Sequence, residues 1–162
     1  MTRATLVVLI SMIVLARPAA SQEVLDGTWR LISSTRTNTA TGAIIETFGS
    51  KPQGFITYGR DGRVLVLITR ADRPKAESIE KITDQQRNQL FSSMIAYAGT
   101  YNFDGKTIEH QIDVSWNEVW SGTKQIRDVK KEGDRLIYTT RPAPSPVDGS
   151  MGFGTVIWEK VK

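Results

Sequence analysis

The chain has 162 residues and a formal net charge of +4 at neutral pH, with no cysteine and a single histidine. This length suits one domain with its own hydrophobic core. The lack of cysteine excludes thiolate catalysis and cysteine-based metal sites, and one histidine excludes a multi-histidine metal site within the chain. We therefore predict no cofactor.

The start of the chain has the three-part layout of a secretory signal peptide. Arg3 gives a positive start, an apolar run covers 4–16, and small residues at 19–21 form the expected cleavage site. The apolar run is too short for a bilayer core, which needs about 20 residues, so we predict no stable membrane span after cleavage. The sequence thus predicts a signal peptide over 1–21, a mature domain over 22–162, and a periplasmic or secreted protein.

Cleavage of that segment would change the charge balance only slightly. It removes Arg3 and Arg17 and no acidic residue, so the net charge falls from +4 to +2. The remaining basic residues are scattered among acids and turns, whereas nucleic-acid binding requires a basic stripe or patch. We predict no nucleic-acid partner.

The stretch over 25–33 opens the mature domain and contains a strand in which Trp29, Leu31 and Ser33 share one face. A polar, turn-rich segment over 35–42 predicts a loop, and a short strand follows over 43–48.

Two further strands, 54–58 and 64–69, flank a G-R-D-G turn that suits a hairpin. The second of them is apolar on both faces. Such a strand is either covered on both sides or lines an apolar cavity with one face.

One helix is expected, over 83–96. Thr83 is a suitable N-cap, with Gln86 three residues later, as in a capping box. Leu90, Phe91, Met94 and Ile95 follow at helical spacing. The helix could lie across a barrel mouth as a lid or pack on the outer wall, and periodicity does not choose between these positions.

The next strands, 97–103 and 106–115, flank an Asp-Gly turn. Alternation places His110 on the apolar face of the second strand, with Ile108, Ile112 and Val114. The remaining expected elements are strands over 122–132 and 135–140, a proline-rich loop over 141–149, and a closing strand over 153–161. The pattern predicts an all-β fold, an antiparallel barrel of about eight to nine strands whose first and last strands pair.

Several motifs give the chain a resemblance to the lipocalin-like domain family of small, largely uncharacterised bacterial and fungal proteins. They are L-x-G-x-W-x-L from Leu25, G-x-I-x-Y-x-x-D-G-R from Gly54, R-x-D-R-P from Arg70, Y-A-G-T-Y from Tyr97, H-x-x-x-x-S from His110, and W-x-G-x-x-Q-x-R from Trp120. The resemblance implies a lipocalin-like β-barrel. Some fungal relatives look like tailoring proteins of secondary metabolism, which implies that such barrels can host cyclisation or isomerisation.

Three polar side chains are expected to face the barrel interior: His110, Gln125 and Arg127. A guanidinium can hold a ligand carboxylate, enolate or phenolate with two parallel hydrogen bonds, and a histidine can move a proton near neutral pH. Tyrosine hydroxyls and rim tryptophans could add contacts. The predicted ligand-binding residues are His110, Gln125, Arg127, Trp120, Tyr97, Tyr101 and Tyr58.

Each of these residues also has a structural interpretation. His110 could be a hydrogen-bonded core residue, since buried polar groups normally find partners. Arg127 could stack on Trp29 as a cation–π contact at the barrel end. Trp116 and Trp120 could simply pack at the rim, given the area that a tryptophan buries.

The sequence favours a binding protein over an enzyme. The leading hypothesis is an exported barrel that binds a small, mainly apolar ligand with a polar or anionic end. An alternative is a cofactor-free isomerase or cyclase, in which His110 acts as acid or base and Arg127 stabilises developing negative charge. A third is a cell-envelope interaction module without a cavity, which would present an exposed apolar patch instead.

Overall fold

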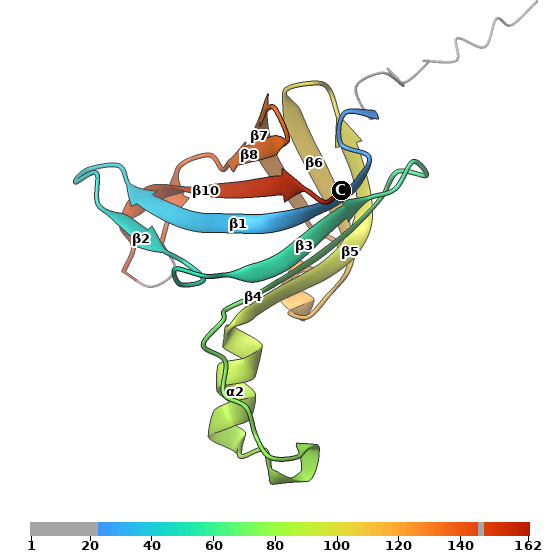
Figure 1. The fold of residues 1–162 in the computed structure, drawn as a ribbon. Coiled ribbons are helices and arrows are strands. Elements are labelled where there is room, and N and C mark those ends of the chain that lie inside the picture. The colour runs from blue at the N-terminus through green and yellow to red at the C-terminus, as the bar shows by residue number, and fades with distance from the viewer. Residues whose placement is uncertain (1–22, 146–147) are drawn as a thin grey trace, which may run out of the picture.

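The computed structural model describes residues 23–145 and 148–162; the expected signal peptide lies outside them. Over the described residues the sheet order is β2-β1-β3-β4-β5-β6-β7-β8-β10-β9, and pairing of β1 with β10 closes eight of these strands into an antiparallel barrel (Figure 1). The predicted fold class and the pairing of first and last strands are confirmed. The elements are β1 (Gly27–Asn38), β2 (Ile44–Glu46), β3 (Gln53–Tyr58), β4 (Arg63–Thr69), η1 (Ile79–Lys81), α2 (Asp84–Ser92), β5 (Met94–Phe103), β6 (Thr107–Ser115), η2 (Glu118–Trp120), β7 (Lys124–Glu132), β8 (Arg135–Thr139), β9 (Ala143–Pro144) and β10 (Met151–Lys160).

The first strand is longer than the sequence pattern indicates. Residues 35–38, expected in a loop, continue β1, and Thr35 pairs with Thr155 of β10 and with Glu46 of β2. The loop prediction was wrong there because β-branched threonines suit a strand that has neighbours on both sides.

One end of the barrel is plugged by Trp29, which is 1% exposed and donates from Nε1 to the Leu25 carbonyl at 2.7 Å. The ammonium of Lys160 lies 4.7 Å from the centre of the Trp29 ring. The cation–π contact considered for Arg127 at this tryptophan is therefore made by Lys160.

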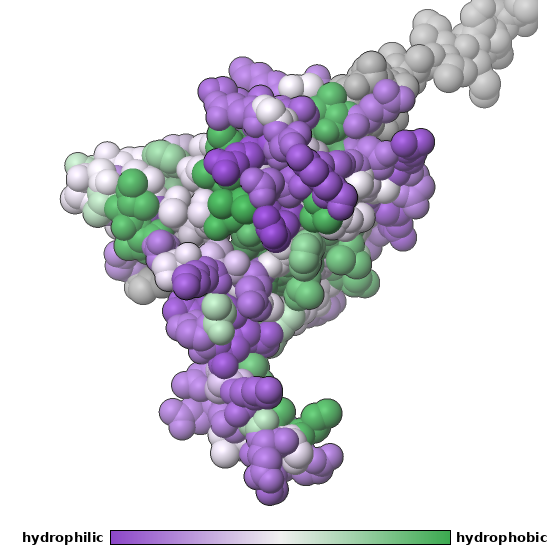
Figure 2. All heavy atoms as spheres, in the orientation of Figure 1, coloured by the Kyte–Doolittle hydropathy of each residue, from purple (hydrophilic) through white to green (hydrophobic). Residues whose placement is uncertain are grey.

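The two apolar faces of β4 have different surroundings. Val64, Val66 and Ile68 are buried in the barrel, whereas Leu65 and Leu67 on the outer face are 55% and 42% exposed. Figure 2 shows hydrophobic side chains exposed on this side of the barrel, with hydrophilic side chains between them. One face of the strand thus lines the interior, and nothing among the described residues covers the other.

A β-bulge interrupts the pairing of β5 with β6. Ala98 pairs with Val114 but Gly99 pairs with Ile112, so Asp113 is an extra residue on β6. Since one extra residue inverts the faces beyond it, Val114 is 62% exposed, although simple alternation placed it inside. His110, on the near side of the bulge, points inward as predicted.

The helix α2 ends at Ser92, earlier than the predicted 83–96, because Ile95 pairs with Ile68 and packs against the core as part of β5. Its N-terminus is the expected capping box, with Thr83 and Gln86 bonded reciprocally. No residue of α2 is buried, and the helix points away from the barrel (Figure 1). It is therefore neither a lid nor a cover of the outer wall.

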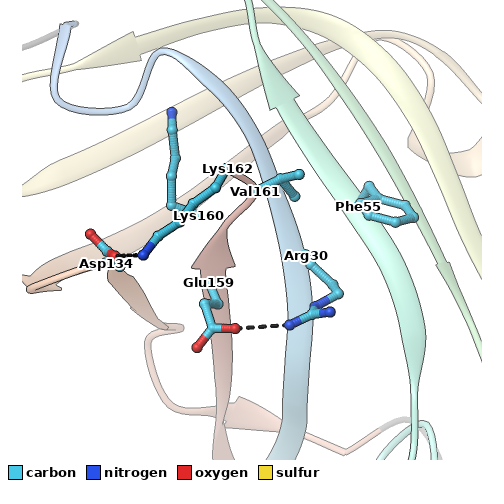
Figure 3. Close-up of a pocket in the computed structure, with 7 residues that line it drawn as sticks. All are labelled: Arg30, Phe55, Asp134, Glu159, Lys160, Val161 and Lys162. Atoms are coloured by element: carbon cyan, nitrogen blue, oxygen red, sulfur yellow. Dashed lines mark hydrogen bonds and ion pairs between the residues drawn. The ribbon is translucent and has the colours of Figure 1, made fainter.

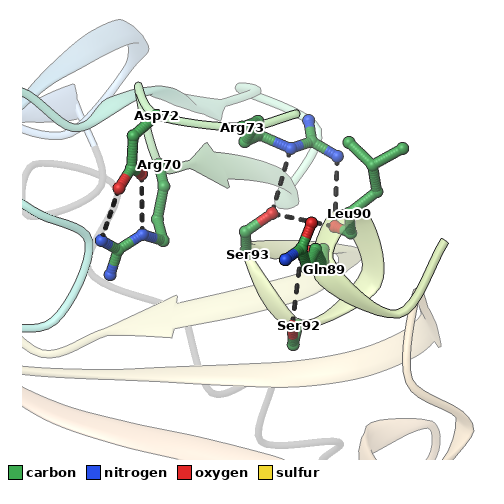
Figure 4. Close-up of polar contacts among 7 residues, drawn as sticks. All are labelled: Arg70, Asp72, Arg73, Gln89, Leu90, Ser92 and Ser93. Atoms are coloured by element: carbon green, nitrogen blue, oxygen red, sulfur yellow. Dashed lines mark hydrogen bonds and ion pairs between the residues drawn. The ribbon is translucent and has the colours of Figure 1, made fainter. Parts of the chain in front are cut away.

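The R-x-D-R-P motif lies at the base of the projecting segment 70–93 (Figure 4). Arg70 binds Asp72 through two hydrogen bonds of 2.9 Å. Arg73 donates to the Ser93 hydroxyl and to the Leu90 carbonyl, both at 3.1 Å. The second arginine thus bonds to a carbonyl in the last turn of α2, where cations are favourable.

Candidate ligand-binding site inside the barrel

The barrel encloses a cavity of about 70 Å³ with a mainly apolar lining. The lining residues are Ser34, Phe48, Ile56, Val66, Ile68, Ile95, Tyr97, His110, Trp120, Arg127, Tyr138, Val156 and Trp158. Ligand pockets usually measure about 300–1,000 Å³, so this cavity holds a group of only a few atoms.

Loops form one part of the lining and strands the other. Phe48 lies in the connection between β2 and β3, and Trp120 ends η2 between β6 and β7. His110, Arg127 and Trp158 instead come from strands β6, β7 and β10. Apolar side chains on loops thus border a polar group that the sheet holds in place.

Four polar rings form a continuous hydrogen-bonded chain in the interior. The Tyr97 hydroxyl lies 2.8 Å from Nδ1 of His110, and Nε2 of His110 lies 2.8 Å from the Tyr58 hydroxyl. Tyr58 in turn lies 2.8 Å from the Tyr138 hydroxyl. Both ring nitrogens of His110 are therefore hydrogen-bonded to tyrosine hydroxyls.

Burial keeps this chain neutral. It lowers the pKa of His110 well below its usual value, and the nearby charge of Arg127 lowers it further. Burial also raises the pKa of Tyr58, Tyr97 and Tyr138. A neutral imidazole has one donor and one acceptor nitrogen, so the chain has a direction.

Arg127 favours one of the two directions. Burial raises the pKa of Tyr97, whereas the positive charge of this guanidinium lowers it, and because arginine can only donate, Arg127 favours the arrangement in which the Tyr97 oxygen serves as an acceptor on that side. Tyr97 then donates to His110 Nδ1, His110 Nε2–H donates to Tyr58, and Tyr58 donates to Tyr138. In this arrangement every acceptor in the chain is used, and the Tyr138 O–H is left as a donor.

Two more donors lack partners. Nη1 of Arg127 and Nε1 of Trp158 are buried and have no hydrogen-bond partner among the described residues. Both side chains line the cavity. The polar part of the site can therefore accommodate hydrogen-bond acceptors.

The structure brings together most of the residues proposed from the sequence. His110, Arg127, Tyr97 and Trp120 line the cavity, and Tyr58 lies one hydrogen bond behind it. Gln125 is cross-strand partner to His110 but does not line the cavity.

Tyr101 also lies outside the lining. Its hydroxyl donates to the Gly59 carbonyl at 3.2 Å, and its ring packs edge-on against Tyr58. Sequence reasoning missed Phe48 and Trp158. Alternation of Val156 and Trp158 in the closing strand was a signal for the latter.

The buried histidine predicts a pH-dependent stability. Because His110 stays neutral in the folded protein, below pH 6.5 only the unfolded chain takes up its proton. The free energy of unfolding should then fall with decreasing pH, by up to about 1.4 kcal/mol per pH unit. Urea denaturation at pH 7.5, 6.5 and 5.5 would measure this slope. His110→Gln should lack it, and equal slopes for the two proteins would contradict the assignment.

A larger concavity, of about 520 Å³, lies on the outer surface near the C-terminus (Figure 3). Its charges are satisfied internally: Arg30 binds Glu159 at 2.9 Å, and Lys162 lies 3.5 Å from Asp134. These ion pairs are exposed to solvent, which makes the concavity a weaker candidate than the buried polar group.

Two properties of the described residues concern metal binding and membrane insertion. No cluster of three or more His, Asp or Glu side chains in the described part of the chain could hold a metal ion. Within the same residues, no helix has the length and apolar character needed to cross a membrane.

Comparison with known protein families identifies the family of the chain. A family model described as a lipocalin-like domain matches residues 26–161. A search of curated proteins found no match. The matched range covers every strand of the barrel.

Proposed function

Since the chain belongs to the lipocalin-like domain family, we propose that it is an exported protein whose barrel binds a small, mainly apolar molecule with a polar or anionic end. The family and the closed barrel support a binding function in general. The single observation that supports the finer proposal is the cavity itself, with apolar side chains on loops and unpartnered donors on strands.

The size of the cavity constrains how binding occurs. A space of about 70 Å³ takes the polar end of a ligand but not an apolar body. Phe48 and Trp120 are only partly buried and lie outside the barrel strands, so they are the side chains that can move to admit the rest. We propose that these two rings form the entrance.

The geometry favours binding over acid–base catalysis. A catalytic histidine needs a nitrogen within reach of the substrate, whereas both nitrogens of His110 are bonded to tyrosine hydroxyls. The exposed outer face of β4 is what the third alternative, an interaction module, would require, but that alternative also required a barrel without a cavity.

Export is supported by the sequence pattern over 1–21. Expression of the full-length gene followed by intact-mass measurement of the exported protein tests it. Loss of residues 1–21 is the expected result, and an uncleaved chain in the cytoplasm would contradict the proposal.

Binding is tested by native mass spectrometry of the mature protein purified from its source, compared with its denatured mass. A reproducible extra mass that disappears on denaturation is expected. Titration with hydrophobic acids, flavonoids and fatty acids, followed by tryptophan fluorescence, gives an independent measure. Trp120→Phe should reduce the fluorescence response, while Trp116→Phe, outside the lining, serves as control. A bare mass together with no response to the panel would overturn the proposal.

A further inference from the structure

The buried polar side-chain atoms of the cavity that lack a partner among the described residues are both donors. Arginine and the tryptophan indole have no acceptor atom, and Arg127 Nη1 and Trp158 Nε1 are both buried without a partner among the described residues. Trp158 is 2% exposed, so solvent does not satisfy its N–H. Of the other polar lining groups, the Ser34 hydroxyl is already bonded to Thr47 at 2.6 Å. An unmet buried donor is costly, which makes an oxygen-bearing ligand favourable here.

The side chains that line the cavity also carry only positive charge. Among the described residues that line the cavity, Arg127 is the one charged side chain, and no Asp or Glu accompanies it. On the outer surface, by contrast, Arg30, Arg63 and Arg70 each have a carboxylate oxygen at 2.9, 2.6 and 2.9 Å. Arg127 forms none of the ion pairs found between described residues. Arg127 is only partly buried, but its Nη1 is buried, and taking part of a cation out of water is unfavourable unless an anion accompanies it.

The count of charges limits the class of anion. The one arginine of the lining balances one negative charge. A phosphate monoester would bring a second charge that no cation of the lining balances, at a high desolvation cost. The cavity volume of about 70 Å³ also suits a small planar head group.

Resting on the proposed function, we propose that the polar end of the ligand is a carboxylate, bound as the anion, whose oxygens accept hydrogen bonds from Arg127 Nη1 and Trp158 Nε1. The Tyr138 hydroxyl, at the end of the hydrogen-bonded chain, is a third donor in the same lining. The apolar body of the ligand then extends between Phe48 and Trp120 toward solvent.

The test compares carboxylates with neutral isosteres of equal shape. Binding of 2-naphthoate and decanoate to the mature protein is measured by calorimetry beside 2-naphthamide and decanamide. The wild type should bind the carboxylates about 10- to 100-fold more tightly, as expected for hydrogen bonds to a charged group. Equal or tighter binding of the amides would overturn this inference while leaving the proposed function intact. No binding of either series would overturn both.

Two variants assign the preference to residues. Arg127→Met keeps the apolar stem but removes the charge and the donors, so it should weaken carboxylate binding much more than amide binding and lose the preference for carboxylates. Trp158→Phe should weaken carboxylate binding severalfold by removing one donor. Circular dichroism checks that each variant is folded. If either variant fails to fold, Arg127→Lys is measured in its place. Lysine keeps the positive charge but lacks the planar guanidinium that can form two parallel hydrogen bonds, so this variant should retain only part of the preference for carboxylates. A preference that survives loss of the guanidinium would overturn the assignment.

Discussion

Replacing Gly99 with alanine should destabilise the barrel by about 3 kcal/mol or more, enough to prevent folding of a marginally stable domain. The reason is the bulge between β5 and β6, which brings the backbone of β6 unusually close. A Cβ at position 99 would overlap the Gln111 carbonyl oxygen and lie 3.1 Å from the amide nitrogen of Asp113. These atoms belong to a paired strand and cannot move aside as a side chain can, so the sheet must distort.

A matched control exists on the opposite side of the barrel. Gly154 is also a strand glycine, in β10, but a Cβ added there makes only ordinary van der Waals contacts, with the Thr140 side chain at 3.5 Å and the Thr35 carbonyl oxygen at 3.8 Å. Gly154→Ala should therefore change the free energy of unfolding by about 0.5 kcal/mol or less. Urea denaturation followed by circular dichroism compares the two variants. Similar stabilities would show that the close approach at Gly99 is not a constraint.

The same bulge shows where sequence reasoning stops. Alternation of apolar and polar residues placed Ile108, His110 and Ile112 inside, and all three are buried. It failed at Val114 because the extra residue depends on how β5 approaches β6, which no local pattern encodes. The predicted end of the helix was wrong for a related reason. Ile95 pairs with β4, and this pairing overrides the helical spacing of the residues that follow α2.

The site was predictable to a similar extent. The inward position of His110 follows from strand alternation, and Arg127 is expected to face the interior as well. Their surroundings do not follow from the sequence, since Phe48 and Trp158 reach the cavity only when a loop folds back and the last strand closes the barrel. The hydrogen-bonded chain likewise joins tyrosines of three strands far apart in sequence.

The hydrogen-bonded chain of tyrosines and His110 predicts a second large effect on stability. Tyr58→Phe should lower the free energy of unfolding by about 2–4 kcal/mol, because one hydroxyl bonds both to His110 Nε2 and to Tyr138 at 2.8 Å. Loss of this hydroxyl leaves His110 Nε2 and the Tyr138 hydroxyl without that partner. Tyr58 is fully buried, so solvent does not replace the lost hydroxyl. Phenylalanine fills nearly the same space, so the cost reflects hydrogen bonding rather than packing.

Tyr101→Phe is the control, since Tyr101 packs against Tyr58 but its hydroxyl donates only to the Gly59 carbonyl. Loss of this one hydrogen bond in Tyr101→Phe should lower the free energy of unfolding by about 1 kcal/mol. Nitrogen-15 NMR of His110 provides a second readout: the wild type should carry its proton on Nε2, and Tyr58→Phe, which removes the acceptor, should shift it toward Nδ1. Equal destabilisation by the two variants, with an unchanged tautomer, would show that Tyr58 does not orient the histidine. A shifted tautomer would show that contacts within the protein decide which nitrogen of His110 carries the proton. The same contacts would then leave the Tyr138 O–H free to donate before any ligand binds.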